Sequence, residues 1–297
     1  MTFRLASVFE REPPVEDLTR EALITVFREL ASRNFDVAKS HATNLASAAK
    51  SLKLDAQKKG DCSFADAAYA ASRFLSSVLA MVRMWEEIYA DRPRPAWDLL
   101  QDSIEGLRWT SQNCEDASRY FVDSFVQQLS GVETMYPFRI FSSIEVIAQR
   151  SRCSLCNRPP LSLACPHIPG EVYCGEMALV VHEDLKFLAV SLVPNPDDKR
   201  CVIEQFSEGA EMHSFSFAAI HALPSNLDSP LRMVSVVRGR RVASKSEFGP
   251  LGDLSPCPCL SGKGYSMCCK TRATIEVPHL YVTLGEQISV DERNITS

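Results

Sequence analysis

The sequence predicts an α+β protein with an N-terminal helical bundle, a central, mainly antiparallel β-rich domain and a small cysteine-rich unit near the C-terminus. Three observations support this fold class. Apolar residues recur at helical spacing over the first ~135 residues, short segments rich in β-branched residues follow, and eight of the eleven cysteines fall into two clusters. At 297 residues, the chain exceeds the roughly 100–200 residues of one domain.

The composition is that of a folded globular protein, with 45% hydrophobic and 23% charged residues. The net charge of −5 argues against a general nucleic-acid coat or a membrane-surface binder. The most apolar runs, such as 187–194, are shorter than the ~18 residues of a membrane helix. The N-terminus lacks the pattern of a signal peptide. We therefore expect a cytoplasmic protein, in which disulfides are rare and clustered cysteines indicate metal binding or catalysis.

Amphipathic segments predict the helical domain, residues 1–135. The first follows the capping candidates Asp17 and Thr19, and the last ends at Gly131, a predicted C-cap. Apolar positions at helical spacing are expected to form the core of a bundle rather than a cofactor site. The predicted helices cover residues 16–32, 34–54, 63–90, 94–109 and 115–131.

From Tyr136 the pattern changes to short strands, which predict a β-rich domain over residues 136–246. Residues 247–255, rich in Ser, Gly and Pro, are typical of a linker. The cysteine-rich unit occupies residues 256–272, and a last strand and a polar tail occupy residues 273–297. The predicted strands cover residues 143–149, 176–181, 186–193, 200–206, 232–244 and 275–284.

The cysteine-rich unit has a spacing that fits a metal ion. Cys257 and Cys259 are two residues apart, so both point to one side of an extended chain. Eight residues containing two glycines then return the chain to Cys268 and Cys269. Four thiolates on two short arms match a closed tetrahedral site of structural zinc, whereas iron–sulfur ligands are spaced differently. We predict that these four cysteines bind Zn²⁺.

The same stretch resembles the SEC-C motif, the zinc knuckle at the C-terminus of the SecA translocase, which also occurs in other bacterial proteins. The motif is Cys-x-Cys, eight residues, then Cys followed by Cys or His, and Ser261–Lys263 and Tyr265 also stand at family positions. Leu260 departs from the usual Gly. The resemblance covers about fifteen residues. It implies metal binding and, because the SecA knuckle docks protein partners, a protein partner. It implies no translocase activity, since the chain has no phosphate-binding loop.

A second cluster lies in the middle of the chain. Cys153-x₂-Cys156 is a typical first arm of a zinc site, and eight residues later comes Cys165-Pro-His167. We predict that these four residues bind a second zinc ion and staple the central domain, with Cys174 an alternative fourth ligand. This region is similar to a group of uncharacterised bacterial proteins, a similarity that implies no activity.

A catalytic zinc would need an open coordination position and a base, for which Glu171 or Glu176 would be the candidates. The signature of the zinc deaminases is absent, so the pattern favours structural zinc. No hydrolase, nucleotide-binding or EF-hand signature occurs either.

The sequence therefore predicts a non-catalytic zinc-binding adaptor that engages protein partners in the cytoplasm and does not engage a membrane. One alternative is a nucleic-acid- or ribosome-associated protein. It would use the basic stretch Arg232–Lys245, which contains Arg238, Arg240 and Arg241. The other alternative is an enzyme with an unrecognised site.

Overall fold

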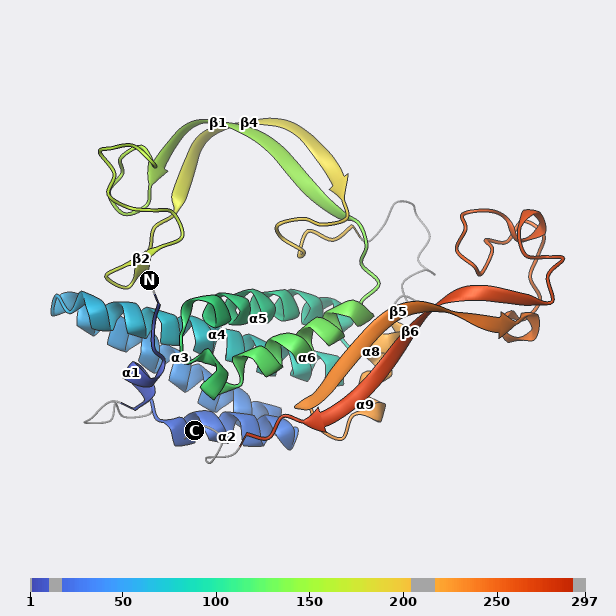
Figure 1. Ribbon diagram of the computed structural model, residues 1–297, viewed down its shortest axis with the longest axis horizontal. Coiled ribbons are helices and arrows are strands. Elements are labelled where there is room, and N and C mark those ends of the chain that lie inside the picture. Colours follow the sequence, from blue (N-terminus) through green and yellow to red (C-terminus); the bar gives the residue numbers. More distant parts are fainter. Residues whose placement is uncertain (1, 11–17, 204–216, 291–297) are drawn as a thin grey trace.

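The computed structural model describes residues 2–10, 18–203 and 217–290. A helical bundle forms the body of the molecule, and two long β-ribbons leave it (Figure 1). One ribbon arches over the bundle and the other extends away from it (Figure 1). The helices are α1 (Ala6–Phe9), α2 (Arg20–Ala31), α3 (Phe35–Lys58), α4 (Cys62–Tyr89), α5 (Pro93–Asn113), η1 (Ala117–Tyr120), α6 (Val122–Met135), α8 (Ala218–His221) and α9 (Leu223–Asn226).

The helices overlap the five predicted segments, because each segment has one apolar stripe that the others bury. α4 is central, and Phe74 and Trp85 on it are fully buried. The predicted cap at Thr19 is confirmed, since its hydroxyl accepts a hydrogen bond of 3.2 Å from the backbone N–H of Ala22. Asp17, the other candidate, lies outside the described residues.

The prediction that Gly131 caps a helix is wrong, because α6 continues to Met135 and buries Gly131 in its interior. A Cβ at Gly131 would lie 1.9 Å from the carbonyl oxygen of Val234, on the strand that crosses α6. The glycine is therefore required for the close approach of a strand to a helix, and not for a positive φ. Sequence alone does not distinguish these two uses of glycine near a helix end.

Gly131→Ala is expected to lower the free energy of unfolding by about 2 kcal/mol or more, because backbone atoms must move to admit the methyl group. Chemical denaturation would measure this loss. Gly264→Ala is the matched control, since its Cβ would meet only the carbonyl of Asp253 at 3.5 Å. Alanine favours helix over glycine by about 1 kcal/mol, so a stabilised Gly131→Ala protein would contradict the close approach.

The strands form separate two-stranded ribbons instead of one sheet. β1 (Phe141–Cys153) pairs antiparallel with β4 (Val180–Val193), and β5 (Arg232–Ser244) pairs antiparallel with β6 (Thr274–Gln287). A small hairpin of β2 (Val172–Tyr173) and β3 (Glu176–Met177) lies between β1 and β4. In the predicted strand 200–206, the described part forms only a bridge between Val202 and Phe141, and residues 204–206 lie outside the description.

The pairing of β5 with β6 places the cysteine-rich unit between two bonded strands. The predicted linker 247–255 thus lies inside a hairpin, and its first two residues belong to a short 3₁₀ helix, Lys245–Phe248. Ser244 and Glu247 form a capping box at the start of that helix. Ser, Gly and Pro are common both in flexible linkers and in turns at the end of a hairpin. The composition of residues 247–255 therefore does not distinguish the two.

The β1–β4 ribbon is held to the bundle at both ends. At its base, Phe141 is buried and its ring stacks on that of Trp97, with a centroid distance of 6.5 Å. From there the ribbon passes over α5, and its far end returns to the bundle beside α3 and α4 (Figure 1).

Candidate metal centres

Two groups of four donor side chains lie at the ends of the two ribbons. In each group, the four donor atoms lie within 4.8 Å of one another. Four sulfur atoms around a tetrahedral zinc, at ~2.3 Å from the ion, would be about 3.8 Å apart. Both groups therefore have the dimensions of a metal site, and they contain the eight residues that the sequence singled out: Cys153, Cys156, Cys165 and His167 in the central group, and Cys257, Cys259, Cys268 and Cys269 in the C-terminal group.

Tight turns bring the C-terminal group together. The sulfur of Cys259 lies 3.3 Å from that of Cys257 and 3.4 Å from that of Cys268. Between the two arms, Leu260 has a φ of 58° and Gly262 a φ of 77°. Leu260, where the sequence departs from the SEC-C motif, thus has a left-handed conformation, which Gly adopts without strain. The Leu260 side chain points into solvent and leaves the donors in place.

The central group forms where β1 ends. Cys153 is the last residue of β1, and its sulfur lies 3.6 Å from Nδ1 of His167. The sulfur atoms of Cys156 and Cys165 are 3.5 Å apart. Tyr173 of the small hairpin fixes the imidazole: its ring packs edge-to-face on His167, and its hydroxyl accepts a hydrogen bond of 2.9 Å from the N–H of Ile168. No sequence signal indicated this role of Tyr173.

Each group pairs a readily ionised thiol with neighbours that hold their protons. A hydrogen bond from the Ser261 hydroxyl, with others from neighbouring thiols, lowers the pKa of Cys259 to about 6. Burial raises the pKa of Cys269 to about 12. At Cys153, burial opposes ionisation, but hydrogen bonds from the N–H groups of Cys156 and Leu155 lower its pKa to about 7. A metal bound by these thiolates would therefore compete with protons.

Cys174, the alternative fourth ligand of the central group, forms a disulfide with Cys62 at the start of α4. This bond corrects the expectation that Cys174 is an alternative fourth ligand, and it is a disulfide in a chain for which disulfides were expected to be rare. Cys174 and Gly175 have φ values of 52° and 79°, which identify a type I′ hairpin turn. The turn points Cys174 toward α4, whereas the metal donors lie on the preceding loop.

Polar contacts reinforce the docking of this hairpin turn on the bundle. The N–H of Gly175 donates a 2.6 Å hydrogen bond to the carboxylate of Asp66, and Nε2 of Gln57 donates a 2.8 Å bond to the carbonyl of Cys174. Burial raises the pKa of Asp66, an effect that the Gly175 N–H opposes. A Cβ at Gly175 would lie 3.0–3.2 Å from atoms of Lys53 and Ala65, so the contact is close. Sequence patterns gave no sign of these partners.

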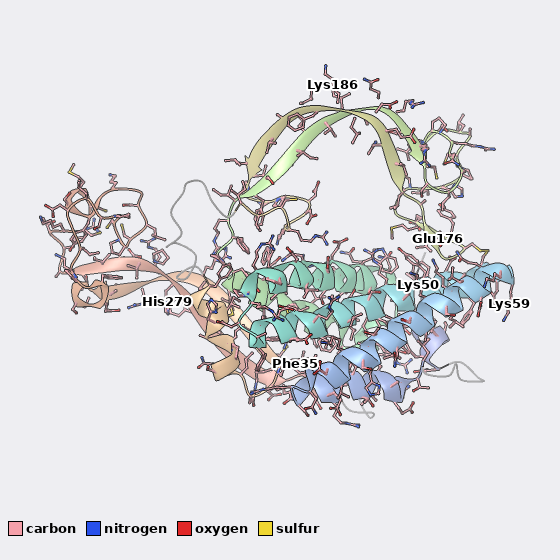
Figure 2. All side chains as sticks on the ribbon, turned by 180° about the vertical axis from the view of Figure 1, so that it is seen from behind. Phe35, Lys50, Lys59, Glu176, Lys186 and His279 are labelled. Carbon is pink, nitrogen blue, oxygen red and sulfur yellow. A yellow bond between two sulfur atoms is a disulfide. The ribbon has the colours of Figure 1, made fainter. Side chains whose placement is uncertain are left out.

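The arrangement around the central group disfavours the catalytic interpretation. Glu176, a candidate base, forms an ion pair of 2.6 Å with Lys53 (Figure 2 labels Glu176 above α3), and this contact lowers the pKa of Glu176. Because four donors already surround one point, the central group has the form of a closed structural site.

The basic stretch Arg232–Lys245 bonds mainly to the chain itself. Arg238 donates to the carbonyl of Thr134 at 3.0 Å, which ties β5 to α6. Arg240 donates to the carbonyl of Cys259 at 3.2 Å, and Arg241 pairs with Glu247 at 2.7 Å. These three arginines tie the β5–β6 ribbon to α6 and to the C-terminal donor group. Their guanidinium groups, which a nucleic acid would contact, therefore already bind partners within the chain.

Within the described ranges, no helix combines the length and apolar character that a bilayer-spanning helix requires. In comparisons with known proteins, no family model, curated protein or solved structure matches this chain. The similarity to the SEC-C motif therefore rests on the residues 256–270 alone.

Proposed function

We propose that this chain is a non-catalytic adaptor that binds protein partners and holds two structural zinc ions, one at the end of each ribbon. The observation that carries the proposal is the pair of closed four-donor groups. Thiolate and imidazole ligands in this number are typical of structural zinc, and magnesium or calcium would require oxygen ligands. With all four positions taken by protein, a bound zinc ion would serve to fix structure.

The adaptor role is supported by apolar side chains exposed around both groups. Leu260 and Met267 lie beside the C-terminal donors with 74% and 82% of their surfaces exposed. Leu161, Leu163 and Ile168 are exposed beside the central donors. Apolar side chains that gather at the ends of projecting ribbons are typical of surfaces that contact other proteins.

Metal content of purified protein tests the zinc sites. The wild type is expected to contain two zinc ions per chain by mass spectrometry, and Cys156→Ser and Cys268→Ser are each expected to contain one. Cys201→Ser, which changes an exposed cysteine outside both groups, should still contain two. A wild type with no zinc would overturn the proposal.

Affinity capture with the full chain tests the adaptor role. Proteins retained by the wild type should be lost with Leu260→Ser/Met267→Ser but retained with Val237→Ser, which changes a residue of the β5–β6 ribbon that is 63% exposed. A wild type that retains no protein would count against an adaptor even if both zinc ions are present.

A further inference from the structure

The Cys62–Cys174 disulfide borders a cavity at the end of the bundle where α4 begins. The cavity has a volume of about 730 Å³, and its walls come from the N-terminal segment 2–7 and from the first turns of α4. Cys62 lines the cavity and is exposed, whereas Cys174 is partly buried and is not part of the lining. A molecule that enters the cavity therefore meets the disulfide from the side of Cys62.

The position of Cys62 in α4 favours negative charge on sulfur. Cys62 is the first residue of this helix, which is 28 residues long. The N-terminus of a helix carries a partial positive charge, which stabilises an anion beside it. Thiolates are the reactive species in disulfide exchange. The helix terminus therefore favours both a thiolate that approaches Cys62 and the thiolate that Cys62 becomes when its bond is broken.

A buried carboxylate connects the cavity with the β2–β3 hairpin. Asp66 lines the cavity one helical turn after Cys62, on the same side of α4. Its side chain is 8% exposed and accepts a 2.6 Å hydrogen bond from the N–H of Gly175, the residue that follows Cys174. The carboxylate and the disulfide thus lie close together between the helix and the hairpin.

The charged side chains of the cavity are mainly acidic. Asp61, which directly precedes α4, lines the cavity together with Asp66. Arg4 is the one cation among the described residues of the lining, and it pairs with Glu115 at 3.0 Å. Apart from the helix terminus, the cavity therefore favours a positively charged group. The rings of Phe3 and Phe64 add apolar surface to the lining.

We propose that this cavity is a site of thiol–disulfide exchange, at which a small aminothiol opens the Cys62–Cys174 bond by attack on Cys62. An aminothiolate carries both charges that the cavity favours. Its sulfur approaches the N-terminus of α4, and its ammonium group lies near the carboxylates of Asp61 and Asp66. The methylene groups between sulfur and nitrogen are short enough for both ends to fit the cavity.

The exchange has two steps, and two aminothiol molecules supply the electrons. In the first step, the thiolate sulfur forms a bond to Sγ of Cys62, the bond between Cys62 and Cys174 breaks, and Cys174 leaves as a thiolate that takes a proton from solvent. In the second step, another thiolate bonds to the sulfur of the attached aminothiol, and Cys62 leaves and is protonated in the same way. The two aminothiols are oxidised to their symmetric disulfide, and the two cysteines are reduced.

Opening the bond removes the covalent link between the β2–β3 hairpin and α4. The burial of Val172 and the Gly175–Asp66 hydrogen bond remain, so the hairpin stays on the bundle but is held less firmly. The far end of the arch thereby responds to thiols. This response is separate from the proposed adaptor function, because none of the eight metal donors takes part in the exchange.

Timed reduction of the full-length protein, purified without reductant and with its zinc content measured, tests the inference. Cysteamine, mercaptoethanol and mercaptoethanesulfonate carry a positive, a neutral and a negative group beside the thiol, and they are compared at equal thiolate concentration. Alkylation at intervals, followed by peptide mass spectrometry, reports the opening of the bond. At low ionic strength, we expect cysteamine to react about fivefold or more faster than mercaptoethanesulfonate, with mercaptoethanol in between.

The mixed disulfide identifies the sulfur that is attacked. After a brief reaction with cysteamine and an acid quench, we expect the adduct on Cys62 and not on Cys174. In fully reduced protein, amide exchange in residues 172–177 should be faster than in the oxidised protein, and it should slow again after reoxidation.

Substitutions test the contribution of the two carboxylates. Asp61→Asn/Asp66→Asn should reduce the preference for cysteamine over mercaptoethanesulfonate to less than about twofold. Asn caps a helix as well as Asp does, and it keeps an acceptor for the N–H of Gly175. The matched control is Asp36→Asn/Asp197→Asn, which removes two exposed carboxylates outside the cavity and should keep the full preference.

The inference is wrong if the three thiols react at equal rates, if the adduct forms on Cys174, or if the bond stays closed in millimolar thiol. A preference that survives Asp61→Asn/Asp66→Asn would contradict the assigned position of the ammonium group. If the exchange occurs as described in a protein without zinc, the inference is supported while the zinc proposal fails. If both zinc ions are present but the bond does not react, the zinc proposal stands and this inference fails.

Discussion

Removing the proposed zinc ions with a chelator is expected to unfold the segment between β5 and β6 while the helical bundle stays folded. The only described apolar cluster at this end of the molecule is small: it comprises the buried residues Ala243, Tyr265, Ile275 and Val277 together with two of the cysteines. Structural zinc contributes about 10–16 kcal/mol to the folding of such units. Hydrogen exchange followed by mass spectrometry should show loss of amide protection over residues 245–273 and unchanged protection in α4.

Acid should have the same effect as the chelator. A hydrogen bond from Ser261 lowers the pKa of Cys259 to about 6, so its thiolate contributes stability that is complete above the ordinary thiol pKa and is lost as the pH falls through 6. Cys201→Ser should behave as the wild type in both treatments, because Cys201 is exposed and outside the donor groups. Protection that persists over residues 245–273 after complete removal of metal would show that the donors do not need an ion to hold this fold.

The features that sequence patterns predicted are those that depend on neighbours along the chain. Helical periodicity located α2 to α6, since it requires only that apolar residues recur on one side of each segment. The donors of each group lie within fifteen residues of one another, so their spacing predicted which side chains would converge. The left-handed conformation at Leu260 was not among the predicted features.

The features that the sequence did not reveal depend on pairing over long distances. β5 and β6 are separated by the whole cysteine-rich unit, and nothing local distinguishes two strands of one ribbon from two strands of different sheets. Gly131 had the sequence context of a helix end, and only the approach of Val234 explains it. Cys62 and Cys174 are 112 residues apart, and their bond forms because the arch returns the β2–β3 hairpin to α4.

Opening the disulfide is expected to destabilise the protein and to release the far end of the arch. In the chain-entropy description, a crosslink that closes a loop of about 100 residues stabilises a protein by about 4–5 kcal/mol. Cys62→Ser/Cys174→Ser should therefore unfold at a markedly lower denaturant concentration. Other contacts of the hairpin include the Gly175–Asp66 and Gln57–Cys174 hydrogen bonds, the Lys53–Glu176 ion pair and the burial of Val172 in the main core. Exposed ion pairs contribute little, so amides in residues 172–177 should exchange faster.

Counting the free thiols and measuring the metal content test whether Cys62 and Cys174 form a disulfide with each other. In denatured, metal-free protein under non-reducing conditions, alkylation should modify nine of the eleven cysteines and leave Cys62 and Cys174 unmodified. Cys62→Ser/Cys174→Ser should keep two zinc ions per chain, because the four central donors do not include Cys174. If eleven thiols react and the double variant loses one zinc ion, Cys174 is a metal ligand and the arch is anchored through the metal centre. If the double variant keeps two zinc ions but is less stable, the metal and the disulfide have separate functions. The metal then orders the end of the β1–β4 ribbon, and the disulfide holds that end to the bundle.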